Sequence, residues 1–303
     1  MKKNYTLWGP SARTCLELTK IPAQETVYSR TVQHAADSFT SNSKQFRHTL
    51  DLDATVVPHR LFIAVPIQNG DDANVRFATD HVAQIVTRAY AKYDNAARVR
   101  FYNAISGHMW FAASAGYLLE NYVLLWLSDA PAGSTLFCSP RHPRRSHRLE
   151  IPVCVQQKYF QSVDYLKQAN NFQLPICLIP ISRVFPTVDV IVLTNHHVIT
   201  IQVTVSSRHN ANQRGFDDIF AKIPRRFQRV RTRCHVFMTD AEDKAKSLRS
   251  QVRDTIPEDV HIYSAVVTIG DQEWDSCLTP ENLERLNNAR VRKSWLHKID
   301  SIY

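Results

Sequence analysis

Apolar and polar residues alternate most clearly between residues 188 and 206, where two β-branched runs flank a short polar turn. The first run covers residues 188–194, and the second follows Asn195-His196. Two such runs joined by a short turn are typical of a β-hairpin. Each predicted strand carries polar residues where a buried strand is normally apolar, with Asp189 in the first and Gln202 and Thr204 in the second.

The register of this predicted hairpin brings its polar residues together. A two-residue turn pairs Thr194 with His197, and the same register places Asp189 directly opposite Gln202. Paired residues share a face of the sheet and lie within about 5.5 Å of each other between Cα atoms. Because side chains alternate along a strand, Gln202 and Thr204 lie on that same face. Buried polar groups need partners, and a metal ion is one partner that suffices, so the pattern predicts a site.

The rest of the chain predicts a mixed series of helices and strands. Thr279-Pro280 is typical of a helix start, with threonine as the cap and proline at the first helical position. Apolar residues at helical spacing predict helices over about 74–93, 109–128, 217–228 and 241–252. Apolar stretches predict strands at 60–67, 134–138, 149–155, 174–179, 235–238 and 261–269. Such a series predicts an α/β fold with a central mixed β-sheet flanked by helices.

These patterns divide the chain into three segments. Residues 1–58 have no clear core-facing period and are predicted to form a peripheral N-terminal segment. Residues 59–270 contain the predicted sheet and form the main domain. Residues 271–303 are predicted to be a C-terminal helical extension.

Composition narrows the class of protein. The formal net charge of +9 favours an anionic partner, with nucleic acid first and an acidic membrane surface second. The six cysteines form no C-x-x-C pair, which favours buried thiols and a reducing compartment. The most apolar window, residues 111–127, is interrupted by Glu120 and Asn121 and is short for a membrane span, and the first residues lack the apolar run of a signal peptide. We therefore expect an intracellular protein, nuclear or cytoplasmic, without a membrane partner. Phosphate-loop, dinucleotide-binding, zinc-protease and serine-hydrolase motifs are absent from the sequence.

Four short motifs occur in an order that carries a family resemblance. Ala115-Gly116 with Glu120 on one helix is followed by Asp189, by Gln202-Val203-Thr204-Val205-Ser206, and by His209. This order resembles the restriction-endonuclease-like PD-(D/E)XK superfamily, and more narrowly the nuclease domains of Crinkler and retrotransposon-hot-spot effectors. The resemblance covers about residues 75–270. It implies a four-stranded mixed sheet flanked by helices, metal-dependent cleavage of DNA, and a mobile-element or effector lineage, so that residues 59–270 would be a nuclease domain.

The chemistry of phosphodiester hydrolysis assigns roles to these residues. The reaction needs an attacking water molecule with a lowered pKa, and an ion that neutralises charge on the scissile phosphate. Mg²⁺ or Mn²⁺ prefers oxygen ligands, so Asp189, the Gln202 amide and Glu120, directly or through water, form a credible ligand set. In the family that the chain resembles, lysine stands two residues after the second acid, where this sequence has Thr204. The missing cation is expected from Lys222, on a helix packed against the sheet, or from Arg208.

Two basic clusters are predicted to contact DNA, with RNA not excluded. The planar guanidinium group of arginine forms paired hydrogen bonds with phosphate oxygens. Several such contacts give salt-sensitive binding without sequence preference. The first cluster contains Arg144 and Arg145, flanked by Arg141 and Arg148. The second contains Arg225, Arg226, Arg229, Arg231 and Arg233.

Each assignment has a simpler alternative. Asp189 could have a structural role near a strand start, and Gln202 and Thr204 could face solvent on an edge strand. Glu120 could be an exposed helix residue, His209 a loop residue, and the arginines a solvated surface or a nuclear localisation signal. At the level of function, the alternatives are a catalytically inactive module that binds DNA or protein, and an interaction protein without a nucleic-acid role.

Overall fold

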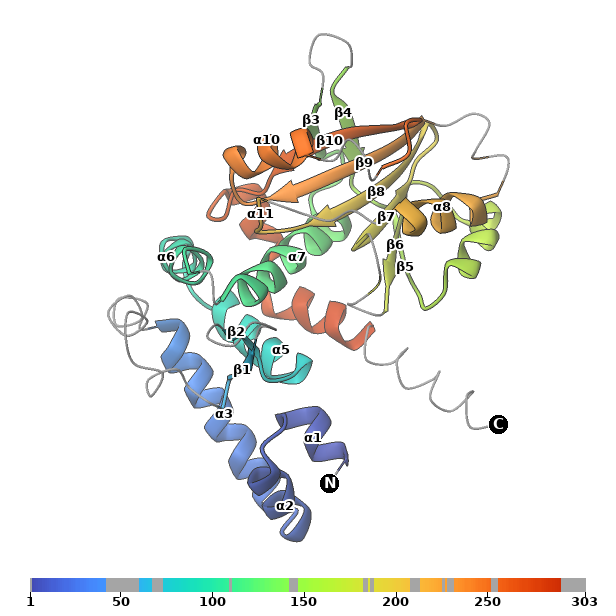
Figure 1. The fold of residues 1–303 in the computed structure, drawn as a ribbon. Helices are drawn as coiled ribbons and strands as arrows, with labels where there is room; N and C mark the ends of the chain where they lie inside the picture. The colour runs from blue at the N-terminus through green and yellow to red at the C-terminus, as the bar shows by residue number, and fades with distance from the viewer. Residues whose placement is uncertain are drawn as a thin grey trace. The chain divides into compact units, whose positions relative to one another are not determined.

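The structure is a computed structural model, and it describes residues 2–41, 60–66, 73–108, 111–141, 147–181, 185, 188–207, 213–224, 227, 232–251 and 256–289. The chain forms two compact units (Figure 1). The first unit combines residues 1–118 with 269–284, and the second combines residues 119–268 with 285–303.

The first unit is mainly helical, and the N-terminal segment is part of its core. Phe39 is buried, and its ring packs edge-on against Phe62 and Phe101, at 5.0 and 5.3 Å between centroids. The predicted boundary between residues 58 and 59 therefore falls inside one packed unit. Val32, Ala36 and Phe39 are buried at helical spacing, so a period is present in this segment and the sequence analysis missed it. The helices are α1 Lys2–Trp8, α2 Ala12–Lys20, α3 Gln24–Ser41, α5 Asp80–Ala91, α6 Asn95–Ser106 and α11 Gln272–Cys277.

Two sequence expectations can be compared directly with this unit. The helix predicted over 74–93 is wrong in its first part, because Ala73–Phe77 forms strand β2, which pairs antiparallel with β1 (Phe62–Pro66). The helix α5 begins only after Thr79, whose hydroxyl accepts from the Val82 amide. The predicted start at Thr279 is confirmed, because the Thr279 hydroxyl accepts from the Asn282 amide at 3.2 Å.

The second unit is built on one mixed sheet. Its described strands have the order β4-β3-β10-β9-β8-β7-β6-β5. Strands β8, β9 and β10 are parallel, and β6, β7 and β8 form an antiparallel series. The predicted mixed α/β architecture with flanking helices is confirmed. The strands are β3 Thr135–Pro140, β4 Leu149–Pro152, β5 Gln156–Phe160, β6 Ile176–Pro180, β7 Val190–Leu193, β8 His197–Val203, β9 Thr232–Thr239 and β10 Val260–Val266.

This sheet curls strongly, because the chain passes directly from one edge strand to the other. From Pro152 at the end of β4 to Gln156 at the start of β5, four Cα steps span at most about 14 Å. Eight strands in a flat sheet would separate the two edges by about 34 Å, at about 4.8 Å for each strand. The connection is held in place by the backbone bond from the Val155 amide to the Pro175 carbonyl, at 3.0 Å.

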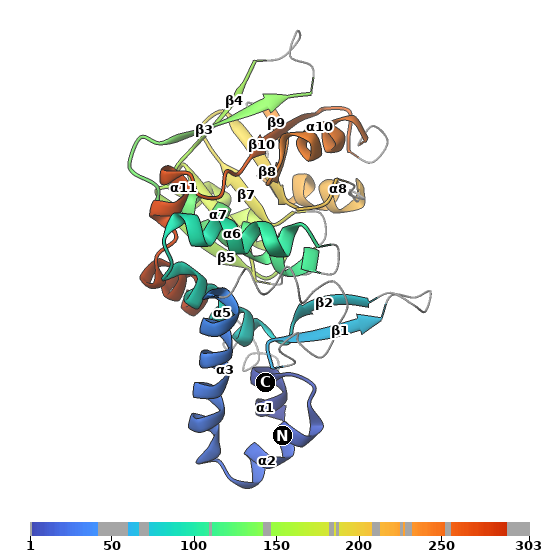
Figure 2. The same cartoon turned by 90° about the vertical axis from the view of Figure 1, so that its left-hand side faces the viewer.

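Helices cover both faces of the sheet. Figure 2 shows α8 (Gln213–Lys222) and α10 (Glu242–Gln251) on one face, and α7 (Ala112–Asp129) on the other. The 3₁₀ helix η2 (Val163–Asn171) shares the core of the first face. That core includes Phe216 of α8, Val198 of β8 and Phe237 of β9. Within the described ranges, no helix is long and apolar enough to cross a membrane.

Candidate functional site

The β7–β8 hairpin has the register that the sequence predicts. Val190 pairs with Ile201, and Leu193 pairs with Val198. At the turn, the Thr194 amide donates to the His197 carbonyl at 3.0 Å. The predicted register is therefore confirmed, because the length of the turn fixes the alignment of the two strands.

Asp189 closes the open end of this hairpin. Its carboxylate Oδ2 accepts from the Val203 amide at 2.7 Å, and its own amide donates to the Ile201 carbonyl at 2.9 Å. The carboxylate thus stands in the ladder where a backbone carbonyl normally accepts. Asp189 has a structural role here, and a carboxylate keeps further lone pairs for another partner.

Gln202 lies on the adjacent strand and is only 7% exposed. Strand β8 is an interior strand between β7 and β9, so the alternative of a solvent-facing edge strand is wrong for Gln202. Alternation places Gln202 on the same face as Thr200, whose hydroxyl lies 2.9 Å from Nδ1 of the buried His235. Thr204, just past the strand, donates from its amide to the Met238 carbonyl at 2.9 Å, and its hydroxyl accepts from the Ser206 amide.

Glu120 is half-buried on α7. Figure 2 shows this helix on the face of the sheet opposite α8, whereas the register of β8 with β9 places Gln202 with the core on the α8 face. The structure therefore brings Asp189 and Gln202 to one end of the hairpin, and Glu120 comes from the helix of the other face. The sequence could place Glu120 on a helix, but not that helix on a face, because both faces of the sheet are apolar.

Lys222 lies beside an acidic residue of the neighbouring 3₁₀ helix. Its Nζ is 3.1 Å from the Asp164 carboxylate, which is also 2.8 Å from Nζ of Lys167. These two ammonium groups, Lys167 first, lower the pKa of the exposed Asp164 carboxyl to about 2. The predicted role of Lys222 as the relocated cation stays a prediction.

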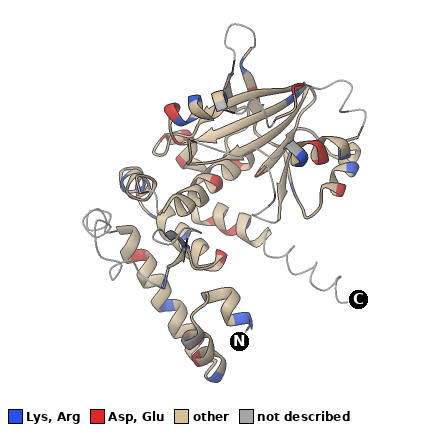
Figure 3. Cartoon of the chain, in the orientation of Figure 1, with Lys and Arg blue, Asp and Glu red and all other residues tan. Residues whose placement is uncertain are grey.

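Three arginines of the two predicted clusters lie in the described part of the chain. Arg148 is exposed, and the Arg141 amide donates to the Ile262 carbonyl at 3.0 Å. Arg233 lies 2.7 Å from the Asp259 carboxylate, and its guanidinium lies over the Phe220 ring at 4.9 Å from the centroid. Figure 3 marks both basic and acidic residues on α8 and on α10. The other predicted residues lie outside the described residues, namely Arg144, Arg145, Arg208, His209, Arg225, Arg226, Arg229 and Arg231.

The sequence analysis missed an acid–lysine pair at the end of β9. Asp240 follows the strand directly, and its Oδ1 lies 2.7 Å from Nζ of Lys244 on α10. The side chains are 8% and 23% exposed. The signal was present, since an acid after a buried strand with lysine four residues later is a recognisable pair. The sequence analysis assigns Lys244 to the helix predicted over 241–252 and gives Asp240 no role.

The described residues could hold a metal ion only if the substrate supplies some of the ligands in its coordination shell. Among them, no group of three or more histidine, cysteine, aspartate or glutamate side chains could hold a metal. Mg²⁺, however, is commonly bound through one or two carboxylates together with waters and substrate phosphates. Asp189 and the Gln202 amide oxygen meet that smaller requirement.

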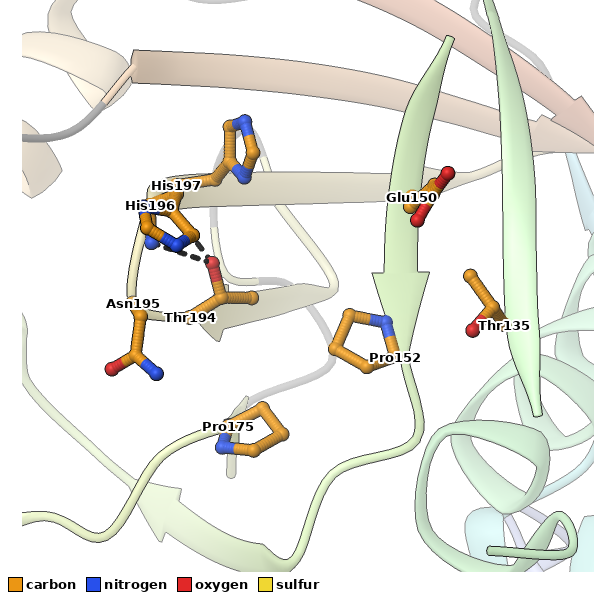
Figure 4. Close-up of a pocket in the computed structure, with 8 residues that line it drawn as sticks. All are labelled: Thr135, Glu150, Pro152, Pro175, Thr194, Asn195, His196 and His197. Carbon is orange, nitrogen blue, oxygen red and sulfur yellow. Dashed lines mark hydrogen bonds between the residues drawn. The ribbon is translucent and has the colours of Figure 1, made fainter. Parts of the chain in front are cut away.

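A pocket of about 330 Å³ lies at the opposite end of the hairpin (Figure 4). Glu150 and Pro152 of β4 border it on one side, and the turn residues Asn195 and His196 border it on the other. With a rise of about 3.3 Å for each residue, the turn lies about 17 Å along β8 from Gln202, so this pocket is separate from the predicted site.

The half-buried His197 at this turn predicts a pH dependence. Burial, and then the neighbouring His196, lower the pKa of His197 below its ordinary value. The unfolded chain therefore binds this proton more readily, and stability is lost as the pH falls below about 6.5 toward the folded-state pKa. Lowering the pH from 7.5 to 5.5 should lower the urea concentration at the midpoint of unfolding. We expect this decrease to be smaller in His197→Gln than in the unmodified chain. The same change at the exposed His261 serves as control, and an equal pH dependence in all three proteins would contradict the prediction.

Comparison with known proteins gives no further guide. No family model, no curated protein and no solved structure matches the chain.

Proposed function

We propose that the protein is a DNA endonuclease that depends on Mg²⁺ or Mn²⁺. One observation carries the proposal. The Asp189 carboxylate accepts a hydrogen bond from the Val203 amide of β8, next to the buried Gln202, in the register of the hairpin. The strands β6, β7, β8 and β9 form a mixed series with helices on both faces, which agrees with the core that the family resemblance implies.

The reaction would proceed by attack of water on phosphorus. The oxygen of the water forms a new bond to phosphorus, one phosphorus–oxygen ester bond breaks, and the leaving oxygen takes up a proton. A bound divalent ion supplies acidity to the water and neutralises charge on the phosphate. Asp189 would hold this ion, and the Gln202 amide would complete its protein ligands with one negative charge fewer than a second carboxylate. The buried position of Gln202 limits rearrangement of this ligand.

DNA binding in this proposal is electrostatic. The net charge of +9 and the two arginine clusters favour phosphate contacts, although Arg233 itself is engaged with Asp259. Each phosphate contact contributes about −0.9 to the slope of log affinity against log salt concentration for duplex DNA. Several contacts therefore predict a slope of several units, measured by titration of a labelled duplex. A slope near zero would show that neither arginine cluster contacts the DNA.

Nicking of a supercoiled plasmid tests the activity. We expect the purified full chain to convert supercoiled to open-circular DNA with Mg²⁺ or Mn²⁺, and to leave it intact with EDTA. Comparison of DNA with RNA of the same sequence would decide the substrate.

The second candidate is a module that keeps the fold and binds DNA or protein without cleaving it. Three observations favour it, namely glutamine at 202, threonine at 204, and Glu120 on the helix of the opposite face. Salt-sensitive DNA binding without nicking in either metal would establish this candidate and exclude the first.

A further inference from the structure

The curl of the sheet forms the pocket at the turn of the β7–β8 hairpin. In a flat sheet of this strand order, β4 and β8 would lie about 19 Å apart, at about 4.8 Å for each of four spacings. The curl instead brings Glu150 and Pro152 of β4 to the same pocket as His196 and His197 of the hairpin. Its volume of about 330 Å³ is at the lower end of the range of sites that bind small molecules.

Hydrogen bonds hold the walls of this pocket in place. The Thr194 hydroxyl accepts from the backbone amides of His196 and His197, at 3.2 and 3.0 Å, and so fixes the turn. On another side of the pocket, the Val155 amide donates to the Pro175 carbonyl at 3.0 Å. Walls that are already ordered lose little conformational entropy when a ligand binds, which favours binding.

The polar groups of the pocket favour a cation. The chain carries a net charge of +9, yet the described residues that line the pocket include one carboxylate, Glu150, and no lysine or arginine. The Glu150 side chain is exposed on β4, so its carboxylate is open to a ligand. Figure 4 shows Glu150 on one side of the pocket and the two histidines on the other.

His197 does not offset the charge of Glu150. Burial, and then the neighbouring His196, lower the pKa of His197 below its ordinary value, so its imidazole is neutral near pH 7. A neutral imidazole keeps one nitrogen that accepts a hydrogen bond. The pocket therefore presents acceptors from both sides.

We propose that this pocket binds a small guanidinium compound with a short aliphatic chain. A guanidinium group presents several N–H donors in one plane and forms paired hydrogen bonds with a carboxylate, which Glu150 supplies. His197 can accept a further N–H from across the pocket, and the rings of Pro152 and Pro175 provide apolar surface for the aliphatic chain. An anionic ligand would instead be repelled by Glu150. The pocket is separate from the proposed nuclease site, so this inference does not depend on the proposed function.

Calorimetric titration with two probes of the same shape tests the charge of the ligand. Butylguanidinium carries the cation, and butylurea replaces it with a neutral planar group on the same aliphatic chain. We expect butylguanidinium to bind the full chain at least about tenfold more tightly than butylurea, because hydrogen bonds to a charged group are stronger. Equal affinity for the two probes overturns the proposal. So does absence of butylguanidinium binding at about 10 mM, ten times the dissociation constant of roughly 1 mM expected for so small a ligand.

Two further measurements locate the ligand. Glu150→Gln keeps the shape of the side chain and should weaken butylguanidinium binding at least about tenfold, whereas Glu284→Gln, at an exposed acid of the first unit, should leave it unchanged. In NMR spectra of the histidine-labelled chain, the ring signal of His197 should shift during the titration, and that of the exposed His34 on α3 should not. Unchanged affinity in Glu150→Gln, or a His197 signal that does not move, overturns the proposal.

Discussion

Asp189→Asn is expected to abolish metal-dependent nicking, with a loss greater than the roughly 10–100-fold typical of groups that only support a metal ligand. The substitution removes one negative charge from a pair of protein ligands that already contains the neutral Gln202 amide. With no carboxylate left, Mg²⁺ loses its preferred hard ligand. The measurement is the initial nicking rate over a range of Mg²⁺ and Mn²⁺ concentrations.

The choice of asparagine keeps the hairpin intact. The amide oxygen of the substituted side chain can still accept from the Val203 amide, as the Asp189 carboxylate does at 2.7 Å. The thermal midpoint should therefore stay close to that of the unmodified chain, whereas Asp189→Ala should lower both the activity and the midpoint. Asp218→Asn, at an exposed acid of α8, is the matched control and should nick normally. Nicking that survives in Asp189→Asn would show a misplaced site or a contaminating nuclease.

Asp275→Ala is expected to lower the free energy of unfolding of the first unit by about 3–5 kcal/mol, the usual cost of breaking a buried ion pair. The Asp275 carboxylate lies 3.3 Å from the Arg98 guanidinium, with side chains only 3% and 9% exposed. Arg98 also donates to the Leu278 carbonyl, and the Gly270 amide donates to Asp275. This network joins α6 to residues 269–284, which are far away in the sequence.

Two comparisons decide whether burial causes this effect. Glu25→Ala, in the exposed pair with Lys3 of the same unit, should cost no more than about 1 kcal/mol. The double variant Arg98→Met with Asp275→Leu should be more stable than Asp275→Ala, because no buried charge is left unpaired. Urea unfolding followed by circular dichroism measures all three. A cost for Asp275→Ala equal to that for Glu25→Ala would contradict the interpretation.

Local patterns predicted the elements whose causes lie within a few residues. The β7–β8 register follows from the length of the turn, and the helix start at Thr279 follows from a cap formed over three residues. The strand β2 was missed because Val75 and Phe77 also fit a helical period with the residues after them. In that case the cap at Thr79 decides the boundary.

Packing over long distances in the sequence was not predictable from these patterns. The N-terminal helices join the first unit through contacts such as Phe39 with Phe101, and residues 269–284 join it through the Arg98–Asp275 pair. A sequence period identifies a buried face but does not identify its partner. The predicted segments therefore differ from the two units of the structure.

The sequence by itself determined the α/β class, the hairpin with its register, and the meeting of Asp189 with the strand that carries Gln202. These depend on backbone geometry that repeats every two residues. Only the tertiary structure decided that α7, the helix that carries Glu120, covers one face of the sheet and that α8 and α10 cover the other. Those positions depend on which face each helix covers, and a sheet that is apolar on both faces gives a single chain no local signal for that choice.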